Sequence, residues 1–275
     1  MSDMDYMQTN DTNQTSSSIG CLSQKSKIIL SISIVAVFLI TLIIIILVVT
    51  LQGDEEPSPE MDYSDFVIIN DLIPEIITEL RYYSSFNFVG EHIDGYEEPV
   101  ALLTKEAAEK LKNASKYFNE NENMTIKIWD SYRPQRAVDH FMRWATDESE
   151  VKMKPYFYPN LTKKEIFDKE FVAKKSGHSR GSTLDITLVY KINGTNADFG
   201  TGFDYFGDKA FYNTTEITEM QNNTRKLLKT VMEENGFRCL PEEWWHFTLN
   251  NEPFPKTYFN FPVNATLIRQ GKKKE

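Results

Sequence analysis

The sequence predicts an α+β domain in which helices flank a small antiparallel sheet, preceded by one transmembrane helix. Three observations favour this fold class: short segments of period-two alternation are scattered among amphipathic helical segments, no internal repeat is present, and one long apolar run lies near the N-terminus. The chain has 275 residues, two cysteines and a net charge of -10. A disulfide-stapled scaffold is therefore excluded, and nucleic acid is not an expected partner.

The apolar run at residues 28–51 contains no charged residue and no proline. At about 1.5 Å per residue it reaches about 36 Å as a helix, which is enough to cross a bilayer. The run is longer than the apolar core of a cleavable signal peptide, so we expect a retained signal anchor. Lys25 and Lys27 precede the run and three acidic residues follow it, which predicts a cytosolic tail at residues 1–27 and an extracellular or lumenal (endolysosomal) C-terminal part.

The segment after the predicted anchor, residues 52–62, is acidic and contains Pro57 and Pro59, a composition typical of a solvated stalk. The folded domain is then expected at residues 63–275. N-glycosylation sequons fit the predicted orientation because they are used only on the lumenal side, although a chain rich in Asn, Thr and Ser also contains them by chance. The candidates are Asn113, Asn123, Asn160, Asn193, Asn213, Asn222 and Asn264.

The first half of the domain shows two helical segments around a strand. Thr104 is expected to be the N-cap of a helix whose apolar residues recur at three- and four-residue spacing up to Phe118. Residues 125–130 alternate as a half-buried strand does. Pro134 suits the first turn of the next helix.

The second half begins with a strand at residues 183–189, in which aliphatic residues alternate with Asp185 and Thr187. Asp185 should therefore project from the face opposite the aliphatic side chains. A long helix is predicted at residues 216–235, and a final buried strand at residues 244–249.

Two histidine-containing strings carry the chemistry. His178 lies seven positions before Asp185, across a turn that can fold it back beside the carboxylate, and His246 follows Glu243 within an aromatic strand. Two histidines and one carboxylate form the ligand set of a catalytic zinc, and Glu243 would be the general base. The structural alternative is that His178 only hydrogen-bonds the turn and that Asp185 pairs with Arg180.

A third string places Arg133 at the junction of a strand and a helix. A guanidinium there can aim into a cleft and stabilise an oxyanion. A structural salt bridge with Asp130 explains the same position equally well.

Taken together, these strings resemble the M15 zinc peptidases, most closely the D-alanyl-D-alanine dipeptidase (VanX-type) branch. The likeness spans roughly residues 65–263, with order and spacing both matching. The four strings that carry it are residues 131–135 (SYRPQ), 176–185 (SGHSRGSTLD), 200–204 (GTGFD) and 243–246 (EWWH).

The resemblance implies the fold of the D-Ala-D-Ala peptidase and Hedgehog N-terminal domains. It also implies one Zn²⁺ per chain, and a role for each matched residue. Asp204 and Tyr82 would hold the ammonium group of a small dipeptide substrate, with adjacent Tyr83 as an alternative to Tyr82, and Ser176 would meet its carboxylate. The remaining roles are zinc ligands for His178, Asp185 and His246, general base for Glu243, and transition-state stabilisation for Arg133.

The expected function is therefore a zinc-dependent dipeptidase for D-alanyl-D-alanine or similar dipeptides, attached to a membrane through residues 28–51. Two alternatives remain open at this point. One is a carboxypeptidase of the same family that acts on longer peptides, for which the ammonium clamp at Asp204 would have to be absent. The other is a surface binding module that keeps zinc without turnover.

Overall fold

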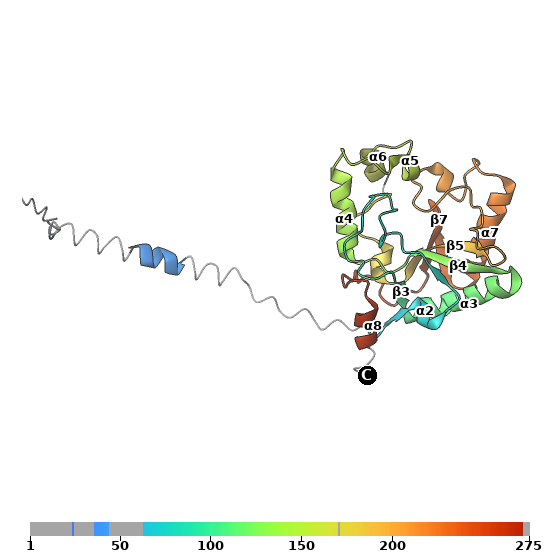
Figure 1. The fold of residues 1–275 in the computed structure, drawn as a ribbon, viewed down its shortest axis with the longest axis horizontal. Helices are drawn as coiled ribbons and strands as arrows, with labels where there is room; N and C mark the ends of the chain where they lie inside the picture. Colours follow the sequence, from blue (N-terminus) through green and yellow to red (C-terminus); the bar gives the residue numbers. More distant parts are fainter. Residues whose placement is uncertain (1–23, 25–35, 44–62, 170, 272–275) are drawn as a thin grey trace, which may run out of the picture. The chain divides into compact units, whose positions relative to one another are not determined.

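The computed structural model describes residue 24, residues 36–43, residues 63–169 and residues 171–271 (Figure 1). The chain divides into two compact units, Met1–Met61 and Asp62–Glu275. In the first unit, residues 36–43 are helical and their side chains are exposed. The rest of the predicted anchor, the stalk at 52–62 and nearly all of the tail at 1–27 lie outside the described residues. Within the described residues, no helix combines the length and apolarity that a membrane crossing requires.

The second unit is built around a five-stranded sheet with strand order β2-β4-β5-β7-β6. A separate two-stranded sheet pairs β1 with β3. The strands are β1 (Phe66–Ile68), β2 (Ile77–Thr78), β3 (Leu102–Thr104), β4 (Met124–Asp130), β5 (Thr183–Tyr190), β6 (Phe237–Leu240) and β7 (Glu243–Leu249).

Two long helices pack against the five-stranded sheet and against each other. They are α3 (Lys105–Asn121) and α7 (Glu219–Glu234). The other helices are α2 (Ile69–Leu72), α4 (Gln135–Thr146), α5 (Lys154–Phe157), α6 (Lys163–Asp168) and α8 (Ala265–Gly271), with 3₁₀ turns at Gly177–Arg180 and Asp208–Ala210. The α+β class is therefore confirmed.

Three details differ from the sequence-based expectations. The sheet is mixed, because β2 pairs in parallel with β4, and a strand of two residues is too short to show alternation in the sequence. Helix α7 begins at Glu219 and not at residue 216, because Thr218 and Gln221 form a capping box that fixes its start. Pro134 occupies the N-cap position of α4, one residue before its first turn.

Thr104 does occupy the N-cap position of α3, but its side chain makes no capping hydrogen bond. Its hydroxyl instead lies 2.8 Å from the hydroxyl of Ser182, and its backbone N–H donates to the carbonyl of Gly181. The end of β3 is thus fastened to the segment between His178 and β5. This attachment leaves no room beside Gly181, which has φ +81° and where an added Cβ would lie 2.4 Å from a ring carbon of Phe66.

We predict that Gly181→Ala destabilises the domain, because it combines left-handed backbone strain of about 1–2 kcal/mol with overpacking of about 1–3 kcal/mol. Gly194→Ala is the matched control: Gly194 has φ +71° but no atom within 4 Å of an added Cβ. That variant should show the backbone cost alone. Urea unfolding of both variants measures the difference, and equal midpoints would contradict the packing argument.

Candidate metal centre and its cavity

A cavity of about 330 Å³ opens on the polar face of the central strands. Every residue to which the sequence assigned a catalytic, metal-binding or substrate-binding role lines it. These residues are Tyr82, Arg133, Ser176, His178, Asp185, Asp204, Glu243 and His246.

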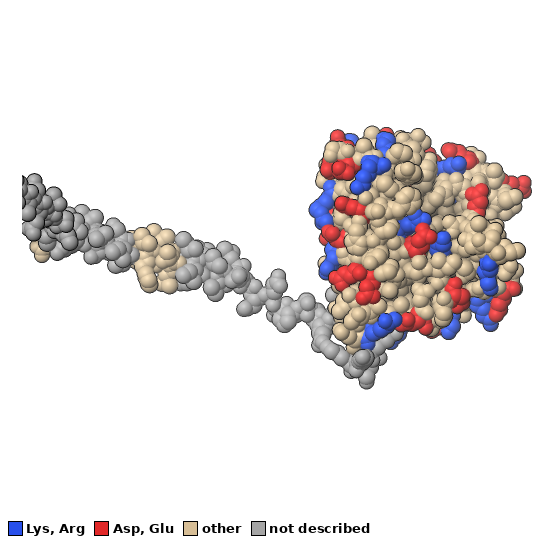
Figure 2. All heavy atoms as spheres, in the orientation of Figure 1, with Lys and Arg blue, Asp and Glu red and all other residues tan. Residues whose placement is uncertain are grey.

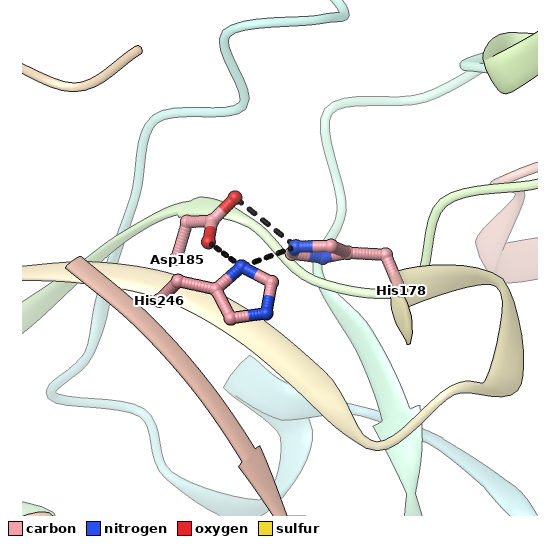
Figure 3. Close-up of side chains that lie close together, drawn as sticks. All are labelled: His178, Asp185 and His246. Atoms are coloured by element: carbon pink, nitrogen blue, oxygen red, sulfur yellow. Dashed lines mark hydrogen bonds and ion pairs between the residues drawn. The ribbon is translucent and has the colours of Figure 1, made fainter. Parts of the chain in front are cut away.

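The centre of the site is formed by His178, Asp185 and His246, whose ligand atoms all lie within 4.8 Å of one another (Figure 3). Nε2 of His178 lies 3.3 Å from an oxygen of Asp185 and 3.3 Å from Nδ1 of His246. Nδ1 of His246 lies 3.1 Å from the other Asp185 oxygen. Two imidazole nitrogens and a carboxylate that face one point fit the donor set of a catalytic zinc.

The sheet register explains why these groups meet. Asp185 on β5 lies directly opposite His246 on β7, and on its other side it pairs with Asp130 on β4. A β-bulge between Ile128 and Asp130 makes the second pairing possible. Without it, Trp129 would pair with Asp185, because Ile128 pairs with Ile186 and the regular register would continue from that pair. The bulge therefore completes a polar row of three residues across three strands.

His178 reaches this row from the 3₁₀ turn before β5. Its Nδ1 lies 2.8 Å from the carbonyl oxygen of Ser131, so Nδ1 carries the proton and donates it, leaving the lone pair of Nε2 directed at the centre. Ser176 caps the turn, because its hydroxyl oxygen accepts the backbone N–H of His178. The Ser176 hydroxyl proton remains available to the cavity.

Glu243 lies at the start of β7, and one of its oxygens is 3.4 Å from Nδ1 of His246. Burial works to lower the pKa of His246, but hydrogen bonds that its ring donates to the carboxylates of Asp185 and Glu243 outweigh burial and raise that pKa to about 9. Burial also works to raise the pKa of Asp185, yet the two histidines hold it below its ordinary value. The surroundings of Nδ1 therefore favour positive charge, as expected where a cation binds.

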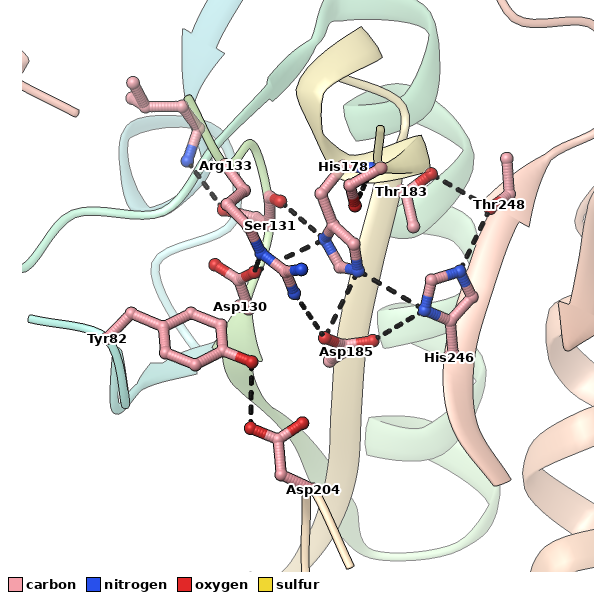
Figure 4. Close-up of polar contacts among 12 residues, drawn as sticks. Tyr82, Asp130, Ser131, Arg133, His178, Thr183, Asp185, Asp204, His246 and Thr248 are labelled. Atoms are coloured by element: carbon pink, nitrogen blue, oxygen red, sulfur yellow. Dashed lines mark hydrogen bonds and ion pairs between the residues drawn. The ribbon is translucent and has the colours of Figure 1, made fainter. Parts of the chain in front are cut away.

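Arg133 takes part in the salt bridge that the sequence left open, and it also lines the cavity (Figure 4). Its Nε donates to the buried carboxylate of Asp130 at 2.8 Å, and a terminal nitrogen lies 3.6 Å from Asp185. The rings of Tyr82 and Phe141 lie 4.9 and 5.2 Å from the guanidinium carbon. The ion pair and the two rings hold the guanidinium in one orientation.

The far end of this polar network is a buried pair formed by Tyr82 and Asp204. The Tyr82 hydroxyl donates to the Asp204 carboxylate at 2.8 Å. Burial, and then the charge of Asp185, raise the pKa of Asp204 well above its ordinary value. Tyr83 does not line the cavity, and its ring packs against His92. Tyr82, and not its neighbour, is therefore the tyrosine of this site.

Arg180 is not the partner of Asp185. Its guanidinium forms two hydrogen bonds with Glu252, at 2.7 and 2.8 Å. The remaining histidines lie elsewhere. The ring of His140 contacts Glu91 and Asp94.

Sequence reasoning gave Asp130 only as a partner for Arg133. In the structure it is fully buried, and it also accepts a 2.6 Å hydrogen bond from Tyr96 and lies 3.4 Å from Nδ1 of His178. The bulge between Ile128 and Asp130 brings Asp130 into contact with the site, and no local pattern in residues 125–130 predicts that bulge.

Comparison with known proteins agrees with this geometry. The M15 peptidase family model, described as D-ala-D-ala dipeptidase, matches residues 62–264. The chain belongs to the M15 peptidase family. This M15 peptidase is 35% identical over 198 residues to the D-alanyl-D-alanine dipeptidase of Enterococcus faecium, covering 72% of this chain and 98% of that protein. It is 36% identical over 199 residues to the enzyme of the same name from Streptomyces coelicolor, with the same coverage.

A solved structure of a VanY D,D-pentapeptidase variant in complex with Zn(II) is also similar. The identity is 12% and the TM-score 0.35, over 65% of this chain and 82% of that chain. Family membership rests on the sequence relatives, and it makes the protein a metallopeptidase.

We predict that the metal centre binds one zinc ion per chain and that His178→Ala, Asp185→Ala and His246→Ala each abolish stoichiometric binding. Removing one of three ligands leaves too few for a stable site. Zinc at about 100 times its Kd should raise the free energy of unfolding by about 2.7 kcal/mol. Elemental analysis and thermal melts with and without chelator measure both effects. His92→Ala is the control, and loss of zinc in that variant as well would contradict the assignment.

Proposed function

We propose that this M15 peptidase is a zinc-dependent dipeptidase that hydrolyses D-alanyl-D-alanine or similar small dipeptides. The observation that carries the proposal is the buried Tyr82–Asp204 pair in the same cavity as the metal centre. An ammonium group is the natural partner of a carboxylate whose pKa is raised by burial, because a bound cation offsets the cost of ionising it. The relatives named D-alanyl-D-alanine dipeptidase support the same choice of substrate.

Each cavity residue then has a chemical task. Asp204 and Tyr82 bind the substrate ammonium, and the free hydroxyl proton of Ser176 donates to the substrate carboxylate. Bound zinc would supply a Lewis acid that polarises the scissile carbonyl and acidifies the attacking water. Glu243 accepts the proton of that water and returns it to the leaving amine.

Arg133 would donate to the oxyanion as it forms. Its orientation is fixed by Asp130 before substrate arrives, so little reorganisation is needed in the transition state. Asp204 also limits substrate length, because a longer peptide would place an uncharged amide against a buried carboxylate. The carboxypeptidase alternative, which requires this clamp to be absent, is therefore disfavoured.

Zinc retention without turnover is the other alternative. A purely structural site needs neither a base nor an oxyanion partner, and both Glu243 and Arg133 line the cavity beside the ligands.

We further propose a single-pass membrane protein with a cytosolic N-terminus and an extracellular or lumenal peptidase domain, on the basis of residues 28–51 and their flanks. Five sequon asparagines are exposed, whereas Asn222 and Asn264 are half-buried. The exposed five are Asn113, Asn123, Asn160, Asn193 and Asn213.

Such a domain would process peptides released from bacterial walls, for instance in a digestive compartment. We expect the domain to resist protease in sealed microsomes and to lose mass on endoglycosidase treatment. Protease sensitivity without detergent, and unchanged mass, would refute this topology.

We predict that the full chain, loaded with zinc, cleaves D-alanyl-D-alanine and that Glu243→Gln lowers kcat by about 10³-fold without loss of zinc, because the general base is lost. L-alanyl-L-alanine and a D-alanine tripeptide are assayed in parallel. Equal activity of wild type and Glu243→Gln would overturn the catalytic assignment. Tripeptide cleavage at a comparable rate would favour the carboxypeptidase instead.

The two adjacent tyrosines offer a matched pair for the ammonium clamp. Tyr82→Phe removes the hydroxyl that positions Asp204 and should raise KM for D-alanyl-D-alanine by about tenfold or more, the effect of losing one hydrogen bond to a charged group, about 1.5 kcal/mol at the least. Tyr83→Phe should leave kinetics unchanged. Steady-state kinetics measure both, and an equal change in the two variants would contradict the role of Tyr82.

A further inference from the structure

Arg225, on helix α7, is a buried cation that the proposed chemistry does not use. Its side chain is fully buried. No carboxylate within the described part of the chain forms an ion pair with it, and its three nitrogens donate to three backbone carbonyls. Nε donates to Phe199 at 2.8 Å, Nη1 to Phe211 at 2.9 Å and Nη2 to Lys209 at 3.0 Å. Burying a guanidinium without a counter-ion costs desolvation free energy, so we expect Arg225 to have a specific structural role.

The three carbonyls belong to one segment, and Asp204 lies between them. Phe199 is five residues before Asp204, and Lys209 and Phe211 are five and seven residues after it. A single side chain therefore joins both ends of the loop that carries the proposed ammonium-binding carboxylate. Between these ends, Asp204 adopts φ +56°, a left-handed conformation that is unfavourable for a residue other than glycine. Such a conformation persists only where the surroundings enforce it.

Trp244 links the same segment to strand β7, which carries Glu243 and His246. Its ring stacks on Phe199 with centroids 3.9 Å apart, and its Nε1 donates to the hydroxyl of Thr201 at 2.8 Å. The guanidinium of Arg225 lies 5.9 Å from this ring. Trp244 directly follows Glu243 in β7. The loop of Asp204 is thus fixed to α7 through Arg225 and to β7 through Trp244.

We infer that Arg225 is a positioning residue for substrate binding: by closing the segment from Phe199 to Phe211 on α7, it holds the carboxylate of Asp204 where the substrate ammonium binds. The inference rests on the proposed function, which gives Asp204 that role. Arg225 itself does not line the cavity. It acts through the backbone of the loop. The planar guanidinium, with donors in fixed directions, can reach three separate carbonyls, which the single ammonium group of a lysine side chain cannot do as well.

The test is steady-state kinetics of full-length, zinc-loaded Arg225→Lys with D-alanyl-D-alanine. Lysine cannot reach all three carbonyls, so we expect KM to rise about tenfold while kcat stays within about threefold and zinc content is unchanged. A role in stability alone would lower the active fraction, and hence apparent kcat, and would leave KM as it is. Lys226→Ala, an exposed neighbour on the same helix, is the control and should match wild type.

A double-mutant cycle decides whether the effect passes through Asp204. In an Asp204→Asn background, Arg225→Lys should raise KM by less than about twofold, because the interaction it supports is already lost. A full additional increase in KM would overturn the inference. So would an unchanged KM in Arg225→Lys alone. If the wild-type enzyme does not cleave the dipeptide, the proposed dipeptidase function is wrong. If the wild type cleaves it and only the expected change in Arg225→Lys is missing, the role of Arg225 alone is wrong.

A second variant keeps the inference testable if Arg225→Lys does not fold. Asp198 is exposed and ties the start of the same loop to α7, accepting from Gln221 at 2.9 Å and from the backbone of Gly200 at 2.9 Å. Asp198→Ala should raise KM in the same direction by a smaller factor. An unchanged KM in this folded variant would show that attachment to α7 does not set the position of Asp204.

Discussion

The structure depends on one constraint: two histidines and two aspartates must lie together in the interior of the domain, three of them on the central sheet and one on the turn before β5. Asp130, Asp185 and His246 form a row across β4, β5 and β7, and His178 closes it from the preceding turn. Burying such groups is expensive unless their charges and hydrogen bonds are matched. The Ser131 carbonyl and the Arg133 guanidinium provide part of that match, and a bound cation would complete it.

The rest of the cavity is arranged around this row. Basic and acidic side chains are interspersed over the face of the domain that Figure 2 shows, whereas the buried charged groups are few. Arg133 connects the row to the Tyr82 ring, and Tyr82 connects it to Asp204. The cavity thus holds both the candidate metal donors and a second buried carboxylate, an arrangement that fits the short zwitterionic substrate proposed for it.

Sequence reasoning located the three candidate ligands, which the structure brings together, because their signal is local. Asp185 alternates with aliphatic residues, and His178 and His246 lie in dense polar or aromatic strings, so each could be placed on a strand face or turn. The features it missed arise from tertiary structure. The bulge beside Asp130 and the parallel pairing of the two-residue strand β2 depend on neighbours distant in sequence. Arg225 gave no signal, because an arginine on a helix usually lies at the surface.

The Tyr82–Asp204 pair joins residues 122 positions apart. The row of Asp130, Asp185 and His246 needs only the pairing of β4, β5 and β7. The Tyr82–Asp204 pair also requires that the two loops carrying these residues have reached their final positions. A partly folded chain that holds the three strands and the turn of His178 would keep all three candidate ligands but lack the group proposed to limit substrate length. Selective dipeptide cleavage would then report completion of folding, and zinc content by itself would not.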